Sequence, residues 1–147
     1  FQAEISRGKI VMDSEDFVCI LDSLAICKFL RRCFDNFYTE LATAYTLITG
    51  IELTANELKH AGERISNLKK IFNIREGWTR QDDSLPSRVM KDPIPDGVAK
   101  GSLITREELD MMLNAYYKAR GWSQSGLIPK KKIHELALDV NHMETIQ

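Results

Sequence analysis

Hydrophobic positions recur at helical spacing along most of the chain. From about Asp13 to Phe34 apolar residues are so frequent that they cover nearly the whole circumference of a helix. A helix of this kind is covered on most sides by other parts of a protein. Asp22 falls in the middle of this segment, where an unpaired buried carboxylate would be costly. We therefore expect Asp22 to have a partner or a ligand.

Two further helices follow, each with a recognisable boundary. One is predicted from about Asn36 to Thr49, with one apolar face and Gly50 placed to end it. The next begins at a capping box, in which the Thr54 hydroxyl accepts from one free backbone N–H and the Glu57 carboxylate from another. The apolar positions of this helix are Leu58, Ala61, Ile65, Leu68 and Phe72.

Regular spacing returns in the last third of the chain. Thr105 and Glu108 form a second capping box, and Gly121 can supply the left-handed turn that ends the helix. A last short helix is predicted after Pro129. The apolar positions of these two helices are Leu109, Met112, Leu113, Tyr116 and Tyr117, then Ile133, Leu136 and Leu138.

Residues 77–102 lack this periodicity and contain three prolines and the turn dipeptide Asp96-Gly97. Unstructured connections longer than about 15 residues are uncommon in compact domains, and here docking on another part of a larger molecule is the better explanation. We find no strand alternation and no repeat. The sequence therefore predicts an all-α fold: a single irregular helical domain over residues 1–147, with about five helices and the long loop at 77–102.

Composition narrows the functional classes. Twenty basic and twenty-one acidic residues give a net charge of -1, which favours neither nucleic acid nor anionic lipid as a partner. The longest uncharged stretch, 41–51, is far shorter than the roughly 20 residues of a membrane-spanning helix. Three cysteines without a C-x-x-C pair argue against a disulfide framework and a self-contained zinc site, and favour a cytoplasmic location.

The three cysteines do not form a metal site by themselves. Cys19, Cys27 and Cys33 are eight and six residues apart, which on one continuous helix separates them by about 80° and 240°. Composition alone therefore identifies them as small buried hydrophobic residues. There is also no glycine-rich phosphate loop and no recognisable pair of catalytic carboxylates.

Three segments, read together, resemble the C-terminal third of the aldehyde ferredoxin oxidoreductase family. The first, Asp22-Ser-Leu-Ala-Ile-Cys27-Lys-Phe29, is similar to the family's D-x-x-G-L-C motif, with alanine at position 25 and isoleucine at position 26. The second segment spans 62–88 and includes Asp82-Asp83 and Leu85-Pro86. The third spans 109–129 and includes Tyr116-Tyr117 and Arg120-Gly-Trp122.

The resemblance assigns roles to three residues of the first segment. Cys27 corresponds to the fourth thiolate ligand of a [4Fe-4S] cluster, whose other three ligands come from a C-x-x-C-x-x-x-C run that is absent here. Asp22 would hydrogen-bond a pterin, and the backbone near Ile26 would approach the cluster and the pterin. Replacement of glycine by Ala25 removes the residue that best permits such an approach. No catalytic residue is assigned.

The resemblance also implies an activity for a larger enzyme. That enzyme would oxidise an aldehyde to a carboxylate at a tungsten or molybdenum bis-pterin centre, and would pass the electrons through the cluster to ferredoxin. Its partners would be the upstream domains of the same polypeptide, ferredoxin and the aldehyde, with a homo-oligomer also compatible. This segment alone would be inactive, because one thiolate of four cannot hold the cluster.

The resemblance also leads to hypotheses about two charged stretches of the chain. Lys28, Arg31 and Arg32 follow Cys27 closely, so we hypothesise that they help to receive an acidic ferredoxin. The stretch 75–88 is expected to form a salt-bridged loop docked on a neighbouring domain, since charged runs are usually solvated or paired. The alternative is a direct contact with a cofactor.

Two alternatives from other classes remain at this point. One is a non-catalytic helical interaction module that keeps the fold but has lost cofactor binding. The other is a free-standing helical bundle of unrelated function, which would have to cover the apolar first helix with this chain alone.

Overall fold

The computed structural model describes residues 6–138 and confirms the all-α class. That range contains six α-helices and one 3₁₀ helix, and no strand. No helix in it is both long enough and apolar enough to cross a membrane. The helices are α1 (Ser6–Ser23), η1 (Lys28–Arg32), α2 (Phe37–Thr49), α3 (Ala55–Arg75), α4 (Ser87–Lys91), α5 (Arg106–Arg120) and α6 (Lys130–Glu135).

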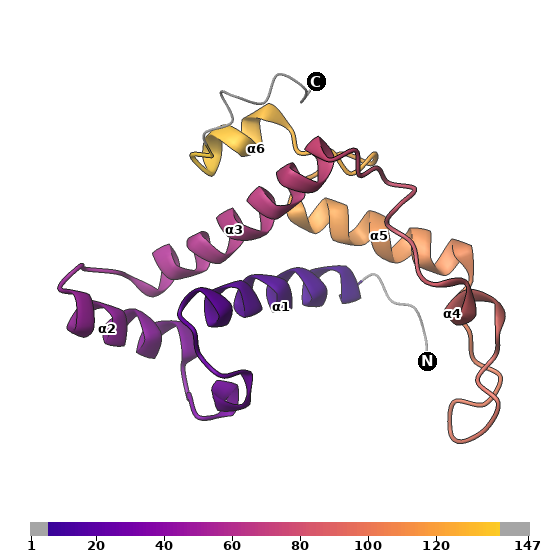
Figure 1. Ribbon diagram of the computed structural model, residues 1–147, viewed down its shortest axis with the longest axis horizontal. Coiled ribbons are helices and arrows are strands. Elements are labelled where there is room, and N and C mark those ends of the chain that lie inside the picture. Colours follow the sequence, from indigo (N-terminus) through magenta and orange to yellow (C-terminus); the bar gives the residue numbers. More distant parts are fainter. Residues whose placement is uncertain (1–5, 139–147) are drawn as a thin grey trace.

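Helix α1 is the centre of the arrangement, because it packs against both α3 and α5 (Figure 1). Helix α2 packs on α3 at one end of the molecule, and α4 lies at the other end. Helix α6 lies beside α3, where the ammonium group of Lys132 donates to the Glu63 carboxylate. Helix η1 projects from the connection between α1 and α2.

Two small hydrophobic cores stabilise this arrangement. One joins α1, α2 and α3, and the other joins α3, α5 and α6. The buried members of the first are Ile20, Leu41, Ala42 and Leu58, and those of the second are Ile71, Tyr117, Trp122, Ile128 and Ile133.

The predicted boundaries of three helices are confirmed. Asn36 caps α2 with its side chain, and Gly50 ends that helix in the left-handed conformation. Thr54 and Thr105 each form the predicted capping box, at the start of α3 and α5 respectively. Gly121 ends α5 with a φ of 71°. Side-chain caps of this kind satisfy backbone groups that have no partner within the helix.

The prediction of one continuous helix from Asp13 to Phe34 is wrong. Helix α1 begins at Ser6 and ends at Ser23, so Asp13 lies inside it, and a separate 3₁₀ helix follows. The chain turns because Ala25 adopts a left-handed conformation, with a φ of 53°. An α-helix cannot continue through a residue in that conformation.

The buried face of α3 also differs from the predicted one. Leu68 and Phe72, which were expected on the apolar face, are half exposed. The buried positions of its second half include three polar residues, Ser66, Asn67 and Lys70. This face is polar because it supports hydrogen bonds to neighbouring segments, as described below.

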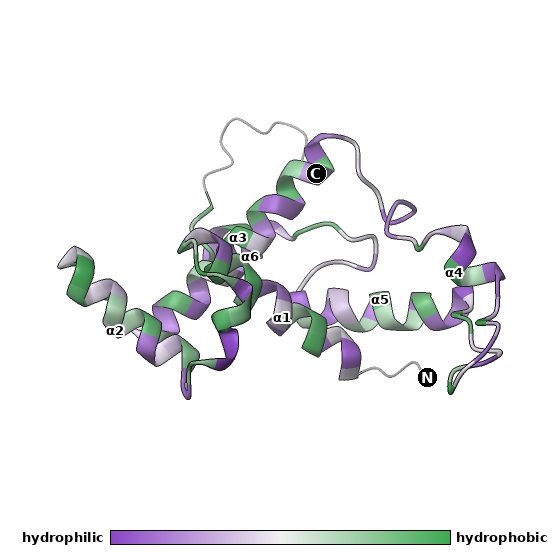
Figure 2. Ribbon diagram, turned by 60° about the horizontal axis from the view of Figure 1, so that its bottom comes forward, coloured by the Kyte–Doolittle hydropathy of each residue, from purple (hydrophilic) through white to green (hydrophobic). Residues whose placement is uncertain are grey.

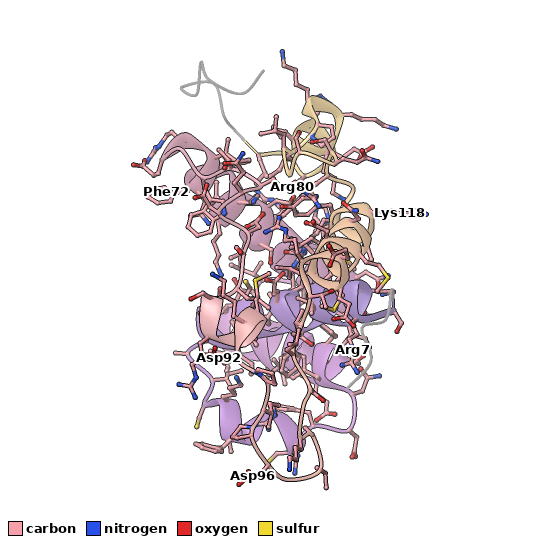
Figure 3. All side chains as sticks on the ribbon, turned by 90° about the vertical axis from the view of Figure 1, so that its right-hand side faces the viewer. Arg7, Phe72, Arg80, Asp92, Asp96 and Lys118 are labelled. Atoms are coloured by element: carbon pink, nitrogen blue, oxygen red, sulfur yellow. The ribbon has the colours of Figure 1, made fainter. Side chains whose placement is uncertain are left out.

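The long connection from 77 to 102 is not wholly irregular. It contains the short helix α4, followed by a narrow loop in which the Ile94 N–H donates to the Ser102 carbonyl at 3.0 Å. Gly101 donates back to the Ile94 carbonyl at 2.8 Å, so the two sides of the loop are paired. The loop extends away from the helices, with Asp96 at its far end (Figure 3).

Candidate functional site

The residues singled out by the sequence lie around the end of α1. The backbone N–H of Ile26 donates to the Leu21 carbonyl at 2.9 Å, and that of Ala25 donates to the Asp22 carbonyl at 3.2 Å. Together with the left-handed Ala25, these two bonds form a Schellman motif, a common way to end a helix. The motif fixes the backbone on both sides of the turn, from Asp22 to Cys27.

Asp22 is exposed on the last turn of α1. The expectation that it lies in a helix covered on most sides is therefore wrong within this chain, since the covered side of α1 carries Cys19, Ile20 and Leu21. An exposed carboxylate needs no partner from the chain, and it is free to accept hydrogen bonds from a bound molecule. Its exposure is compatible with the pterin contact that the resemblance implies.

Ile26 contributes its side chain to the first core, where it is partly buried. Its N–H is already used in the Schellman motif. Any approach of the backbone at Ile26 to a cofactor would therefore involve its carbonyl group rather than its N–H group.

Cys27 is an exposed free thiol at the start of η1. Cys33 is also exposed but follows the opposite end of η1, and Cys19 is buried on α1. The composition-based reading of all three as buried is thus correct only for Cys19. Cys27 and Cys33 are separated by the whole of η1.

The exposed thiol of Cys27 has the chemistry that the implied iron-sulfur cluster requires of a ligand. An accessible cysteine outside any disulfide can provide a thiolate, which is the ligand that iron-sulfur clusters use. Within residues 6–138 no three His, Cys, Asp or Glu side chains gather into a group that could hold a metal ion. The accessibility of Cys27 is therefore compatible with the role of a single cluster ligand, and the described residues do not complete such a site.

A second group of polar residues, which the sequence did not identify as a site, surrounds Asp83. Its carboxylate accepts from Lys70 Nζ at 3.1 Å, from Trp78 Nε1 at 2.7 Å and from the Tyr117 hydroxyl. Arg80, labelled in the upper half of Figure 3, donates to the Gln124 carbonyl at 2.8 Å. The residues after α3 are thereby attached to α5 and to the segment that follows it.

The ionisation of Asp83 reflects these contacts. Burial alone would raise its pKa, but the hydrogen bonds from Tyr117, Trp78 and Lys70 outweigh burial and lower the pKa below its usual value. Burial and the Asp83 carboxylate together raise the pKa of Tyr117. Asp83 therefore stays ionised at neutral pH, and Tyr117 stays protonated as the donor.

A third polar group attaches α5 to α1 through Arg120, whose guanidinium group is buried. It donates to Asp16 Oδ1 at 2.6 Å and to Glu15 Oε2 at 2.7 Å, and the Tyr116 hydroxyl donates to the same Glu15 oxygen at 2.6 Å. Burial opposes the charge of Arg120, but the hydrogen bonds that it donates to Glu15 and Asp16 raise its pKa above the usual value. The cation of this group is buried, whereas its partners Asp16 and Glu15 are 14% and 47% exposed.

These two polar groups explain part of the sequence resemblance. Asp83, Tyr116, Tyr117, Arg120 and Trp122 all belong to the segments that carry it. Within the described residues the stretch 75–88 forms ion pairs with α3 and α5, through Lys70–Asp83 and Arg80–Asp110. The expected docking on a neighbouring domain stays a prediction. In both groups each cation has a carboxylate partner, and the pairs attach neighbouring segments to one another.

Comparisons with known proteins agree with the sequence resemblance. A family model described as "Aldehyde ferredoxin oxidoreductase, domains 2 & 3" matches residues 1–138. The chain is 34% identical over 132 residues to the tungsten-containing aldehyde ferredoxin oxidoreductase of Pyrococcus furiosus, covering 88% of this chain and 21% of that protein. It is 32% identical over 135 residues to the protein of that name from Pyrococcus horikoshii, covering 90% and 21% respectively.

A further relative carries a different name. The aliphatic sulfonate oxidoreductase, WOR-like subunit, of Pyrococcus furiosus is 31% identical over 120 residues, which are 78% of this chain and 18% of that protein. The chain therefore spans about a fifth of the length of the relatives that it matches.

Proposed function

We propose that this chain, which belongs to the aldehyde ferredoxin oxidoreductase family, forms the C-terminal part of an enzyme that oxidises aldehydes to carboxylates. In the proposed reaction an aldehyde and water yield a carboxylic acid, two protons and two electrons. A tungsten or molybdenum bis-pterin centre would supply the two-electron chemistry when bound. The electrons would leave through a [4Fe-4S] cluster to ferredoxin.

The exposure of the free Cys27 thiol is the observation that supports this proposal most directly. Cys27 combines an exposed, free thiol with the cysteine position of the motif that resembles the family's. In the proposed enzyme Cys27 provides one thiolate to the cluster, and Asp22 accepts hydrogen bonds from the pterin. The Schellman motif fixes the conformation of the backbone that joins these two residues.

The remaining functions of the enzyme depend on the rest of the polypeptide. Three cluster ligands, the groups that act on the substrate and most of the pterin site would be upstream, so this segment alone is inactive in the proposal. The aldehyde itself is left open, because the relative named as a sulfonate oxidoreductase subunit matches the same region. Three free cysteines favour a reducing compartment such as the cytoplasm.

The test is metal analysis and EPR spectroscopy of the full-length protein and two cysteine variants. We expect tungsten or molybdenum together with iron in the wild type, and a reduced-cluster EPR signal. Cys27→Ser should lose most of this signal and of the iron. Cys33→Ser is the matched control, because Cys33 is also exposed but lies beyond η1, and this variant should keep both the signal and the iron.

Two results would contradict the proposal. A wild-type protein without iron, tungsten and molybdenum would support the non-catalytic interaction module instead. Equal loss of iron in Cys27→Ser and Cys33→Ser would remove the specific role of Cys27.

A further inference from the structure

Helix η1 is a short exposed segment that begins directly after Cys27. None of its five residues is buried, and three of them, Lys28, Arg31 and Arg32, are cationic. We propose that η1 is the docking surface for a small acidic protein that carries electrons away from the cluster. This inference rests on the proposed function, because it requires a redox centre at Cys27.

Charge is the first argument. No ion pair joins Lys28, Arg31 or Arg32 to another residue within 6–138, whereas Arg120, Lys70 and Lys132 are all paired. The only hydrogen bond recorded for these three side chains within that range runs from Arg31 Nη1 to the Lys28 carbonyl at 3.0 Å. The chain as a whole has a net charge of -1, so this is a local positive patch on a nearly neutral molecule. A patch of this kind attracts an acidic partner and speeds its association.

Exposed apolar side chains are the second argument. Phe29 is 86% exposed and Leu30 is 48% exposed, between the cationic residues. An apolar centre with a charged rim is typical of protein interfaces, where aromatic residues contribute much of the binding energy. A surface of only five residues is small, and small interfaces suit weak, transient complexes such as those between redox proteins.

Position is the third argument. The Leu30 N–H donates to the Cys27 carbonyl at 2.9 Å, so the docking surface and the cluster ligand belong to one hydrogen-bonded turn. A protein bound at η1 would lie next to whatever Cys27 binds. Electron transfer becomes slower as the distance between the centres grows, so this is a favourable place for an acceptor.

The experiment uses the full-length holoenzyme with an acidic ferredoxin and, separately, with a small uncharged quinone as the electron acceptor. For Arg31→Glu/Arg32→Glu we expect kcat/KM with ferredoxin to fall about tenfold or more at low ionic strength. Its dependence on salt should weaken, because the attraction that salt screens has been removed. Activity with the quinone and the EPR signal of the cluster should not change.

A matched control is available on α6. Lys130→Glu/Lys131→Glu makes the same change in total charge at two exposed residues of a different surface. This variant should keep most of its activity with ferredoxin. Phe29→Ser should lower kcat/KM with ferredoxin while leaving its salt dependence as in the wild type, because it removes apolar contact but no charge.

Three results would overturn the docking proposal. The first is unchanged ferredoxin activity in Arg31→Glu/Arg32→Glu, and the second is an equal loss in the α6 control. The third is a loss of quinone activity or of the EPR signal, which would show that η1 supports the cluster rather than the partner. A wild-type enzyme without a cluster would be a failure of the proposed function, and the docking proposal would fall with it.

Discussion

At the scale of single residues, Ala25 occupies a backbone conformation that is unfavourable for alanine. Its φ of 53° lies in the left-handed region, where the Cβ atom crowds the following carbonyl group. The family motif that this chain resembles has glycine at this position, which adopts such a conformation without that penalty. The substitution therefore affects the end of α1, rather than only the approach of a cofactor.

We predict that Ala25→Gly increases the free energy of unfolding by about 1 kcal/mol, because it relieves this crowding. Urea unfolding of the chain measures the change. Ala44→Gly, in the middle of α2, is the control and should lower the stability by about 0.5–1 kcal/mol. If Ala25→Gly and Ala44→Gly lowered the free energy of unfolding by similar amounts, Ala25 would not be strained.

Asp83 gives a second prediction at this scale. Asp83→Asn removes the negative charge that neutralises the Lys70 ammonium group. The Lys70 side chain is only 9% exposed. We expect a loss of about 1–3 kcal/mol at neutral pH. Urea unfolding followed by the fluorescence of Trp78 and Trp122, the two tryptophans of the chain, provides the measurement.

The pH dependence of this loss follows from the lowered pKa of Asp83 in the folded chain. The ionised carboxylate stabilises the fold above the unfolded pKa of about 4, and that contribution disappears as the pH falls through the lower, folded value. The wild type and Asp83→Asn should therefore differ at about pH 7 and become similar near pH 2. A difference that stays constant over this range would contradict the assignment.

At the scale of the helices, α1 is held to α5 by Arg120 and to α3 by close backbone contact. Arg120→Met removes the hydrogen bonds to Glu15 and Asp16, so we expect a loss of about 2 kcal/mol in the free energy of unfolding. Arg75→Met is the control. Its ion pair with Glu76 is half exposed, and such pairs contribute about 0–1 kcal/mol.

The contact between α1 and α3 depends on Gly62. A Cβ atom at this position would lie 2.7 Å from the Asp16 carbonyl oxygen, which is closer than Cβ atoms approach in proteins. Gly62→Ala should therefore lower the stability by about 1–2 kcal/mol, although alanine favours helices more than glycine does. Gly8→Ala should act similarly, because its Cβ would lie 2.5 Å from the backbone nitrogen of Tyr116. A more stable Gly62→Ala variant would show that the helices can separate easily.

Sequence signals for these helices were strongest where a cap is local. Thr54 with Glu57, and Thr105 with Glu108, are close in the sequence, so both boundaries could be predicted. The end of α1 could not, because alanine carries no stop signal, and only the family's glycine at this position could have indicated it.

The buried polar face of α3 was missed for a different reason. Lys70 and Asn67 are buried because they bond to Asp83 and Trp122, which lie 13 and 55 positions away in the sequence. Periodicity cannot report such distant partners. For the candidate site, the motif indicated Cys27 and Asp22, but their exposure could only be seen in the fold.

At the scale of the whole molecule, apolar side chains remain exposed at the end of α2. Leu47 is 81% exposed, Ile48 is 84% exposed and Ile51 is 59% exposed, and Figure 2 shows the apolar positions along this helix. Exposed apolar residues that gather in one place favour association with other surfaces. These residues belong to neither core, and the α2 residues of the first core, such as Leu41 and Ala42, lie in the first half of the helix.

We predict that Leu47→Gln/Ile48→Gln makes the chain less prone to self-association without unfolding it. Little apolar area is lost from the cores, so the free energy of unfolding should change by less than about 0.5 kcal/mol. Sedimentation velocity over a range of concentrations measures the association. Leu41→Gln is the control from the same helix: this residue is 5% exposed, and a buried polar group without a partner should destabilise the fold by about 2 kcal/mol or more. If Leu47→Gln/Ile48→Gln destabilised the chain as much as Leu41→Gln does, the end of α2 would have to be part of a core rather than an open surface.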